Sequence, residues 1–461
     1  MGSGCFFTLP WYRMELNLFE VASADMTVSC KGVFILNKTV FERGSVGHIR
    51  IHVLPTTRFK TFAVSLYAGI PLNEETVTTA ALTPFVLRRG TVSYPETIQF
   101  RKQLEHLYGA GFGFDVYKRG NYQIIQFRVD TINDEFVSSS DSLLHKTFSF
   151  LGEVVTKPVT ENGVFREAYV NSERETVRKK LEAIINDKIR YAAERCMEEM
   201  FRGDPYRLHP LGQRKDLDGI TPASLYEAFQ QWLQQANLDL YVVGDTTLAE
   251  VQELVEQHFT LGRSSSPVYV PVKSEAAGGD VRVVEEVLDV NQGKLNMGLR
   301  IPVTYGDDQY AAALLYNGIL GSYPHSKLFI NVREKESLAY YAASRFDGHK
   351  GIISIQSGIE IANYSKALEI IKAQLASLRD GQISELEMSQ TKAMLRNTLL
   401  EMQDSAFDIV AYDFNRVLSG RERPVEELLR QIEAITPEDV VRVANSVELD
   451  TIYFLTGKKE A

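Results

Sequence analysis

The chain has 461 residues, of which 44% are hydrophobic and 24% charged, a composition typical of a soluble globular protein with a large core. Its 50 basic and 60 acidic residues leave a net charge of −10, which argues against binding nucleic acid or an anionic membrane through bulk charge. Three widely spaced cysteines indicate no disulfide framework, and no apolar run is long enough to predict a membrane span. The first residues lack the pattern of a signal peptide, so we expect a cytoplasmic protein.

Residue periodicity predicts both strands and helices in the first half of the chain. In chain order they are a strand at 49–54, a strand at 62–68, a helix within 74–87, a helix at 99–108, a strand at 122–129, a helix at 136–155, a long charged helix at 172–200 and a strand at 240–243.

The second half repeats this mixture without strict alternation. Its predicted elements are a strand at 295–301, a helix at 309–320, a strand at 352–357, a helix at 364–379, a helix at 384–403 and a strand at 451–455. Antiparallel-rich sheets covered by helices, an α+β fold, therefore fit the chain better than a doubly wound sheet.

Short matches in the same order indicate an internal duplication. Residues 93–95, Ser-Tyr-Pro, recur at 322–324, and an Ile-Thr-Pro helix start before a strand occurs at 220–222 and at 435–437. A stretch rich in Ser, Gly, Ala and Pro separates the two halves. The predicted domain map is an unmatched N-terminal extension (1–13), a first peptidase-like domain (14–260), a linker (261–280) and a second such domain (281–461).

The first half carries a segment that resembles a known zinc motif. Residues 80–91 read Ala-Ala-Leu-Thr-Pro-Phe-Val-Leu-Arg-Arg-Gly-Thr. In the pitrilysin, insulinase and mitochondrial-processing-peptidase clan, the similar helix carries His-x-x-Glu-His and ends in Gly-Thr. Two histidines four residues apart share a helical face and can bind one Zn²⁺, while the glutamate between them serves as general base.

Neither metal binding nor proton transfer is possible at the matching positions of this chain, which are Ala81, Pro84 and Phe85. Pro84 also removes a helix hydrogen bond, so we expect the helix to break there. The family's third ligand aligns with Glu182 or, equally well, with Lys180, and either reads as a solvated charge on a long helix. The resemblance therefore implies a degenerate zinc motif and no cofactor in this chain.

No other histidine pattern predicts a metal or catalytic site. His48 and His52 are four residues apart, but on the strand expected there they lie roughly 13 Å apart, too far to share a zinc ion. His106 has no second histidine at ligand spacing, and the remaining histidines are scattered along the chain.

The second half contains a segment that resembles the clan's C-terminal signature, Leu-Phe…Arg-Glu-Lys…Leu-Ala-Tyr, at residues 328–340. The resemblance implies that Arg333 and Tyr340 bind substrate: the guanidinium would donate to substrate carbonyls and the phenol to the oxyanion of the tetrahedral intermediate. The structural alternative is that Arg333 forms an ion pair with Glu334 or Glu336, and that Tyr340 is a core aromatic of a strand.

In this clan some enzymes divide the site between two homologous chains, and this sequence is similar to the zinc-deficient, YmfF-like bacterial subgroup. The resemblance implies a non-catalytic subunit, inactive alone, that supplies Arg333 and Tyr340 to a zinc-bearing homologous partner acting on a peptide or protein substrate. Some members of the subgroup are associated with modification of elongation factor P. The alternative is a non-hydrolytic scaffold or peptide-binding protein of the same fold.

Overall fold

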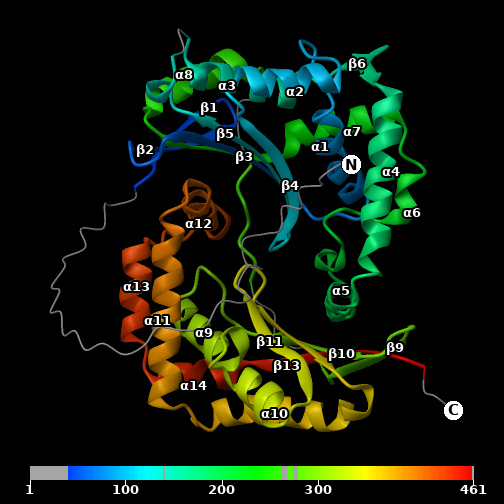
Figure 1. Cartoon of the computed structure of the whole chain (residues 1–461), viewed down its shortest axis with the longest axis vertical. Coiled ribbons are helices and arrows are strands. Elements are labelled where there is room, and N and C mark those ends of the chain that lie inside the picture. Colours follow the sequence, from blue (N-terminus) through cyan, green and yellow to red (C-terminus); the bar gives the residue numbers. More distant parts are fainter. Residues whose placement is uncertain (1–39, 139–140, 262–266, 274–278, 459–461) are drawn as a thin grey trace. The chain divides into compact units, whose positions relative to one another are not determined.

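The computed structural model describes residues 40–138, 141–261, 267–273 and 279–458. The predicted N-terminal extension, 1–13, lies outside the described residues, as do 262–266 and 274–278 of the predicted linker. The described chain contains two mixed sheets, each with its own helices, which confirms the α+β class and the two sheet-bearing halves (Figure 1).

The first sheet has six strands, and only β2 and β8 pair in parallel. Its central strand β3 is buried along most of its length, and alternate residues such as Val64 and Leu66 enter the core beneath the helices. In sheet order the strands are β1 (Glu42–Val46), β2 (Ile49–Pro55), β8 (Asn237–Gly244), β3 (Thr61–Pro71), β5 (Tyr122–Ile132) and β4 (Gly111–Arg119).

Helices α2, α3 and α8 run along the outer face of this sheet, as Figure 1 shows at its upper edge. The helices of the first half are α1 (Val77–Leu87), α2 (Thr97–His106), α3 (Leu143–Thr156), α4 (Glu167–Ile184), α5 (Lys188–Met200), α6 (Arg214–Leu217), α7 (Pro222–Gln235) and α8 (Leu248–His258), with a small hairpin of β6 (Thr160–Glu161) and β7 (Val164–Phe165).

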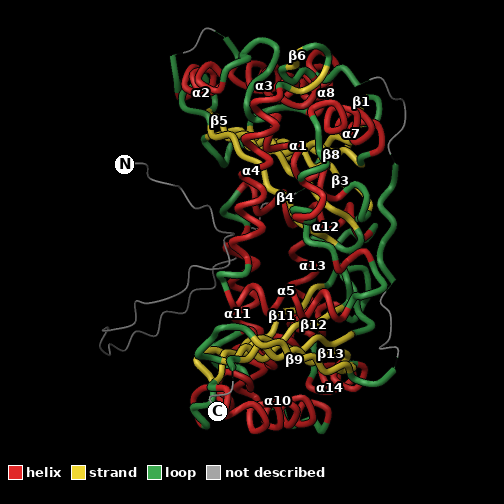
Figure 2. Tube along the Cα trace, turned by 90° about the vertical axis from the view of Figure 1, so that its right-hand side faces the viewer, coloured by secondary structure: helices red, strands yellow, loops and turns green. Residues whose placement is uncertain are grey.

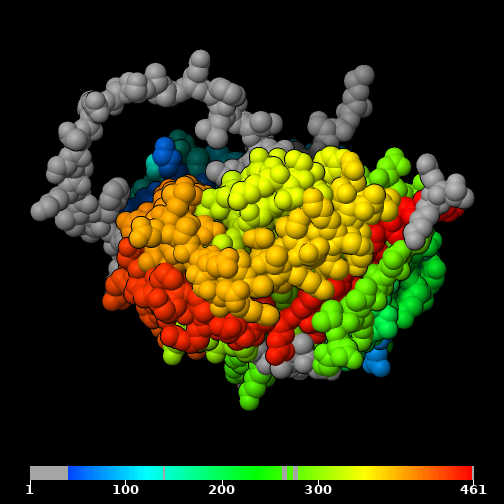
Figure 3. Space-filling view, turned by 90° about the horizontal axis from the view of Figure 1, so that it is seen from below, coloured from blue at the N-terminus to red at the C-terminus, as the bar shows by residue number. Residues whose placement is uncertain are grey.

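The second sheet has five strands: β11 (Ala339–Asp347), β12 (Ile352–Ile359), β10 (Gly293–Arg300), β13 (Glu448–Thr456) and β9 (Arg282–Val287), in that order. Its helices are α9 (Tyr310–Asn317), α10 (Tyr364–Arg379), α11 (Glu385–Met402), α12 (Ala406–Ser419), α13 (Val425–Ala434) and α14 (Pro437–Ser446). Figure 2 shows both sheets in yellow, and Figure 3 looks onto the helices of the second half, including α10.

The two sheets share one topology, which confirms the duplication. Strands β2-β8-β3-β5-β4 of the first sheet match β9-β13-β10-β12-β11 of the second in order, and each set has a single parallel pair, β2 with β8 and β13 with β9. Both Ile-Thr-Pro segments begin helices as predicted. Thr221 caps α7 and Thr436 caps α14, each with a proline in the first turn and a capping box.

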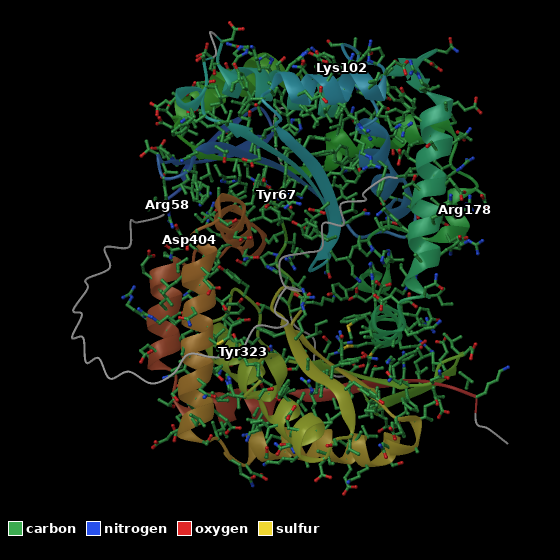
Figure 4. The ribbon with its side chains drawn as sticks, in the orientation of Figure 1. Arg58, Tyr67, Lys102, Arg178, Tyr323 and Asp404 are labelled. Carbon is green, nitrogen blue, oxygen red and sulfur yellow. The ribbon has the colours of Figure 1, made fainter. Side chains whose placement is uncertain are left out.

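Each half lends a helix to the sheet of the other. Helix α5 packs on β10 and β13, where Cys196 lies against Tyr453, and α12 packs on β3 and β8. Phe414 of α12 stacks on Tyr67, with ring centroids 4.0 Å apart, and Figure 4 shows Tyr67 on the side of the first sheet that faces α12. This exchange joins the two cores through apolar contacts from both directions.

Two predicted helices are wrong in their extent. The single helix expected at 172–200 is two helices, α4 and α5, because the Asp187 side chain accepts a hydrogen bond from the Arg190 backbone N–H and starts a new helix. The helix expected from residue 136 begins only at Leu143, where Ser142 provides the cap.

The middle of the predicted linker packs on the first sheet. Tyr269 is buried, and a Cβ on Gly69 would lie 2.3 Å from its hydroxyl oxygen, so the glycine makes room for the ring. Arg50 donates a hydrogen bond to the Pro267 carbonyl at 2.7 Å. The linker boundaries stay a prediction, while residues 267–273 are held by these contacts. Among the described helices, none combines the length and hydropathy needed to cross a membrane.

Candidate functional site: a degenerate zinc motif and an Arg/Tyr segment

The degenerate zinc motif lies on α1, which is buried along nearly its whole length. Ala81 has no exposed surface, Phe85 is 4% exposed, and Pro84 is also buried. The predicted break at Pro84 is wrong, because α1 continues to Leu87. Packing against α4 and α7 holds the helix together through the proline.

Phenylalanine side chains fill the space beside Phe85. The ring of Phe114 on β4 meets Phe85 edge to face, with centroids 4.8 Å apart and planes at 78°. The Arg88 guanidinium lies 5.5 Å from the Phe85 centroid and 5.4 Å from that of Phe114. A zinc site needs N, S or O ligands, and a nearby positive charge opposes the binding of a cation. The two phenylalanine rings under the Arg88 guanidinium provide no ligand and an unfavourable charge.

Glu173 and Glu182 of α4 both form ion pairs with arginines. Glu173 is buried and pairs with Arg89 at 3.2 Å and Arg88 at 3.5 Å. Glu182, one of the two aligned candidates for a third ligand, pairs with Arg214 of α6 at 2.9 Å. Within the described residues, no group of three or more His, Cys, Asp or Glu side chains is placed to hold a metal. The residues of this motif therefore do not fit zinc.

The backbone between residues 329 and 340 departs from regular structure in three ways. Residues Phe329–Lys335 form a π-helix, a rare conformation that is frequent at functional sites. Ser337 has φ = 51°, in the left-handed region that non-glycine residues seldom adopt. The register of β11 against β12 shifts between Ala339 and Tyr341, which leaves Tyr340 as the extra residue of a bulge.

The two predicted substrate-binding residues are both exposed in this irregular segment. Tyr340 is 57% exposed at the start of edge strand β11, so the alternative reading as a core aromatic is wrong. The Arg333 guanidinium lies 4.6 Å from the Phe329 ring and 3.6 Å from the Glu334 carboxylate. Glu336 instead accepts Lys366 at 2.7 Å. The ion pair of Arg333 with Glu334 that the structural alternative expected is therefore present, as a long and exposed contact.

A charged network between the halves was not predicted from the sequence. Arg43 of β1 donates to both carboxylate oxygens of Asp413 on α12, at 2.6 and 2.8 Å, and the Tyr241 hydroxyl donates to Asp413 at 2.8 Å. His52 accepts from Arg43 at 2.8 Å and donates to the buried Asp239 at 2.9 Å. His52 lies on β2, as the strand prediction required, and its role here is structural.

Burial governs the protonation of this network. Burial lowers the pKa of His52 below its ordinary value, and Arg43 adds to the shift while Asp239 opposes it. Burial alone would raise the pKa of Asp239, but hydrogen bonds from Arg50 and His52 hold it below its ordinary value. The network therefore contains an ionised aspartate and a neutral imidazole at neutral pH.

A second unpredicted feature is a histidine pair. His145 of α3 and His258 of α8 are separated by 113 residues, yet their Nε2 atoms lie 3.4 Å apart. Sequence spacing could not reveal this pair, because the contact depends on how two helices pack on the first sheet.

Comparisons with known proteins show that this chain is similar to inactive homologues of peptidases. Residues 219–395 match the family model described as "Peptidase M16 inactive domain". A Bacillus subtilis (strain 168) protein named "Probable inactive metalloprotease YmfF" is 39% identical over 90% of this chain and 97% of its own length. A solved "conserved protein from Enterococcus faecalis V583" is 31% identical with a TM-score of 0.87, over 91% of this chain and 99% of that one. A "peptidase M16 inactive domain from Pseudomonas fluorescens", 20% identical over 91% of this chain and 99% of that one, has the same fold with a TM-score of 0.76.

Proposed function

Because the chain belongs to the M16, or pitrilysin, family of peptidases as one of its inactive homologues, we propose that it is the non-catalytic subunit of a heterodimeric zinc peptidase. The partner would be a homologous chain with an intact zinc motif. This chain would supply Arg333 and Tyr340 to the shared site, and its substrate would be a peptide or protein.

One observation carries the proposal. At the three positions that align with His-x-x-Glu-His, the first half carries buried residues with no ligand atom, while the second half has an exposed tyrosine and a half-exposed arginine on an irregular backbone segment. Strained or irregular backbone costs stability and persists where the surrounding structure or function requires it. A chain that had lost all peptidase-related function would have no need to hold Tyr340 at a bulge.

The chemistry of the two residues suits substrate binding. A guanidinium is permanently charged and can donate several hydrogen bonds to the carbonyl oxygens of an extended peptide. A phenol hydroxyl can donate to the oxyanion that develops when a peptide carbonyl is attacked. The general base and the metal would come from the partner, so the isolated chain would hydrolyse no peptide.

The cellular setting is part of the proposal. We place the complex in the cytoplasm, whose reducing environment suits a chain with three widely spaced cysteines. The resemblance to the YmfF-like subgroup makes modification of elongation factor P a candidate process. A non-hydrolytic scaffold of the same fold is the second candidate, favoured by the fully degenerate α1 motif.

Purification of the protein from its own cells distinguishes the heterodimeric peptidase from the scaffold. The tagged protein is purified at natural abundance, and co-purifying chains are identified by mass spectrometry. The proposal expects a homologue with His-x-x-Glu-His in equimolar amount and peptidase activity in the complex. Equimolar recovery with unrelated proteins alone would favour the scaffold.

A further inference from the structure

The packing of α3 on α8 creates a pair of imidazoles at the outer layer of the first half. His145 lies in the first turn of α3, and His258 is the last residue of α8. Their rings are nearly perpendicular, at 88°, with centroids 4.6 Å apart. His145 is exposed and His258 is half-buried.

A close helix contact fixes this arrangement. A Cβ on Gly152 of α3 would lie 2.5 Å from the carbonyl oxygen of His258, so only glycine lets the end of α8 approach so closely. The Ser142 side chain accepts a hydrogen bond from the His145 backbone N–H, which anchors the start of α3. The two imidazoles therefore sit on rigid helix ends and are brought together before any ligand binds.

The separation of the two nitrogens matches a metal coordination edge. Zinc–nitrogen bonds of about 2.0–2.1 Å at tetrahedral angles place two ligand nitrogens about 3.3–3.4 Å apart. The His145 and His258 Nε2 atoms are 3.4 Å apart, and the side-chain amide oxygen of Gln257 lies 3.3 Å from the His145 Nε2. Both distances therefore match the spacing between two neighbouring ligand atoms of a tetrahedral metal ion.

We propose that His145 and His258 form a binding site for a divalent transition metal of the zinc or nickel class, with the Gln257 amide and water completing the coordination. The bound ion would cross-link α3 to α8. This site is independent of the degenerate motif on α1 and of the function proposed above, since all three residues lie on the helices that cover the outer face of the first sheet.

A metal binds the lone pair of an unprotonated imidazole nitrogen, so protons compete with the metal for both rings. A plain hydrogen bond between two neutral imidazoles is the competing account of the same contact, and it predicts no affinity for metal.

Isothermal titration with Zn²⁺ or Ni²⁺ into the tag-free, metal-stripped full-length protein tests the site. We expect one equivalent of metal to bind, and both His145→Ala and His258→Ala to weaken binding by about tenfold or more. His106→Ala, at the exposed end of α2, is the matched control and should bind as wild type does.

Thermal unfolding without metal checks that each variant is folded, and His258→Gln replaces His258→Ala if the smaller side chain destabilises the helix contact. Added Zn²⁺ should raise the unfolding temperature of wild type and of His106→Ala only. Absence of binding to wild type, or loss of binding in only one of the two histidine variants, would overturn the proposal.

Discussion

Phe85 and Phe114 meet edge to face, 4.8 Å between ring centroids, at the position that by sequence resemblance aligns with the second histidine of His-x-x-Glu-His. The contact does more than remove a ligand, because it fills the surrounding space with apolar surface and Arg88 covers both rings. Phe85 is therefore part of the hydrophobic core of the first half.

The first prediction is that the α1 motif binds no zinc. Ala81, Pro84 and Phe85 offer no ligand atom, so the double variant His145→Ala, His258→Ala should bind no Zn²⁺ at all. Metal analysis after dialysis against micromolar zinc measures this, and a peptide library measures hydrolysis. One tightly retained zinc per chain in the double variant, or hydrolysis by it, would contradict the prediction.

Phe85 is predicted to stabilise the fold. Truncation of a buried phenylalanine removes apolar contact and leaves a cavity, so Phe85→Ala should lower the free energy of unfolding by about 3–5 kcal/mol. Val92→Ala is the control, because Val92 is 63% exposed and its truncation should change stability by no more than about 0.5 kcal/mol. Urea unfolding compares the two. Equal effects would mean that the region around α1 is not a packed core.

The link between Arg43 and Asp413 is predicted to hold α12 on the first sheet. Asp413→Asn leaves the Arg43 guanidinium without its charge partner and should cost about 2–3 kcal/mol, less than a fully buried pair because Arg43 is partly exposed. The control is the exposed pair of Arg58 and Asp404, 2.5 Å apart and labelled in Figure 4. Asp404→Asn should cost about 0.5 kcal/mol or less. If Asp413→Asn leaves the free energy of unfolding unchanged, the apolar contacts of α12 alone hold it on the first sheet.

Mild acid is predicted to destabilise the fold through the protonation of His52 in the unfolded chain. The folded-state pKa of His52 is lowered, so the unfolded chain binds the proton more readily. The stability that His52 contributes is therefore present above a pH of about 6.5 and is lost as the pH falls below it, by up to about 1.4 kcal/mol per pH unit.

Urea unfolding between pH 7.5 and 5.5 measures this slope. His52→Gln should reduce it without abolishing it, since burial also lowers the pKa of His349. Identical slopes for wild type and His52→Gln would show that His52 does not cause the loss of stability in acid.

Long periodic elements were predicted well from the sequence. Helix α10 has the predicted bounds at both ends, and the duplication inferred from short matches appears as one strand order in both sheets. Edge strands were missed: β4 begins in a Gly-Ala-Gly-Phe-Gly segment that reads as a turn, and only pairing with β5 makes it a strand.

The substrate-binding role of Arg333 and Tyr340 stays a prediction, and the geometry of their segment could not be predicted from the sequence. Arg333 and Tyr340 follow from a local motif, but a π-helix, a positive φ at Ser337 and a bulge are set by packing that no residue pattern encodes. The same holds for His145 and His258, which only the crossing of α3 and α8 brings together.

Arg333 is predicted to bind substrate in the reconstituted complex with the zinc-bearing partner. Arg333→Ala removes charge-assisted hydrogen bonds worth about 1.5–3 kcal/mol each, so kcat/KM should fall about 10- to 100-fold. Lys335→Ala is the control, because Lys335 is a neighbouring exposed cation whose Nζ donates only to Asn331. Equal losses of kcat/KM for the two variants would indicate that any positive charge in this segment has the same effect.

Peptide cleavage by the complex carrying Tyr340→Phe tests the shared-site account most directly. The substitution keeps the ring and removes only the hydroxyl donor, while Tyr108→Phe makes the same change at a tyrosine of the first half that is 52% exposed, against 57% for Tyr340. With assembly confirmed by size, we expect Tyr340→Phe to lower kcat by about 10²–10³ and Tyr108→Phe to leave it unchanged. A Tyr340→Phe complex that assembles and cleaves at the wild-type rate would contradict the account.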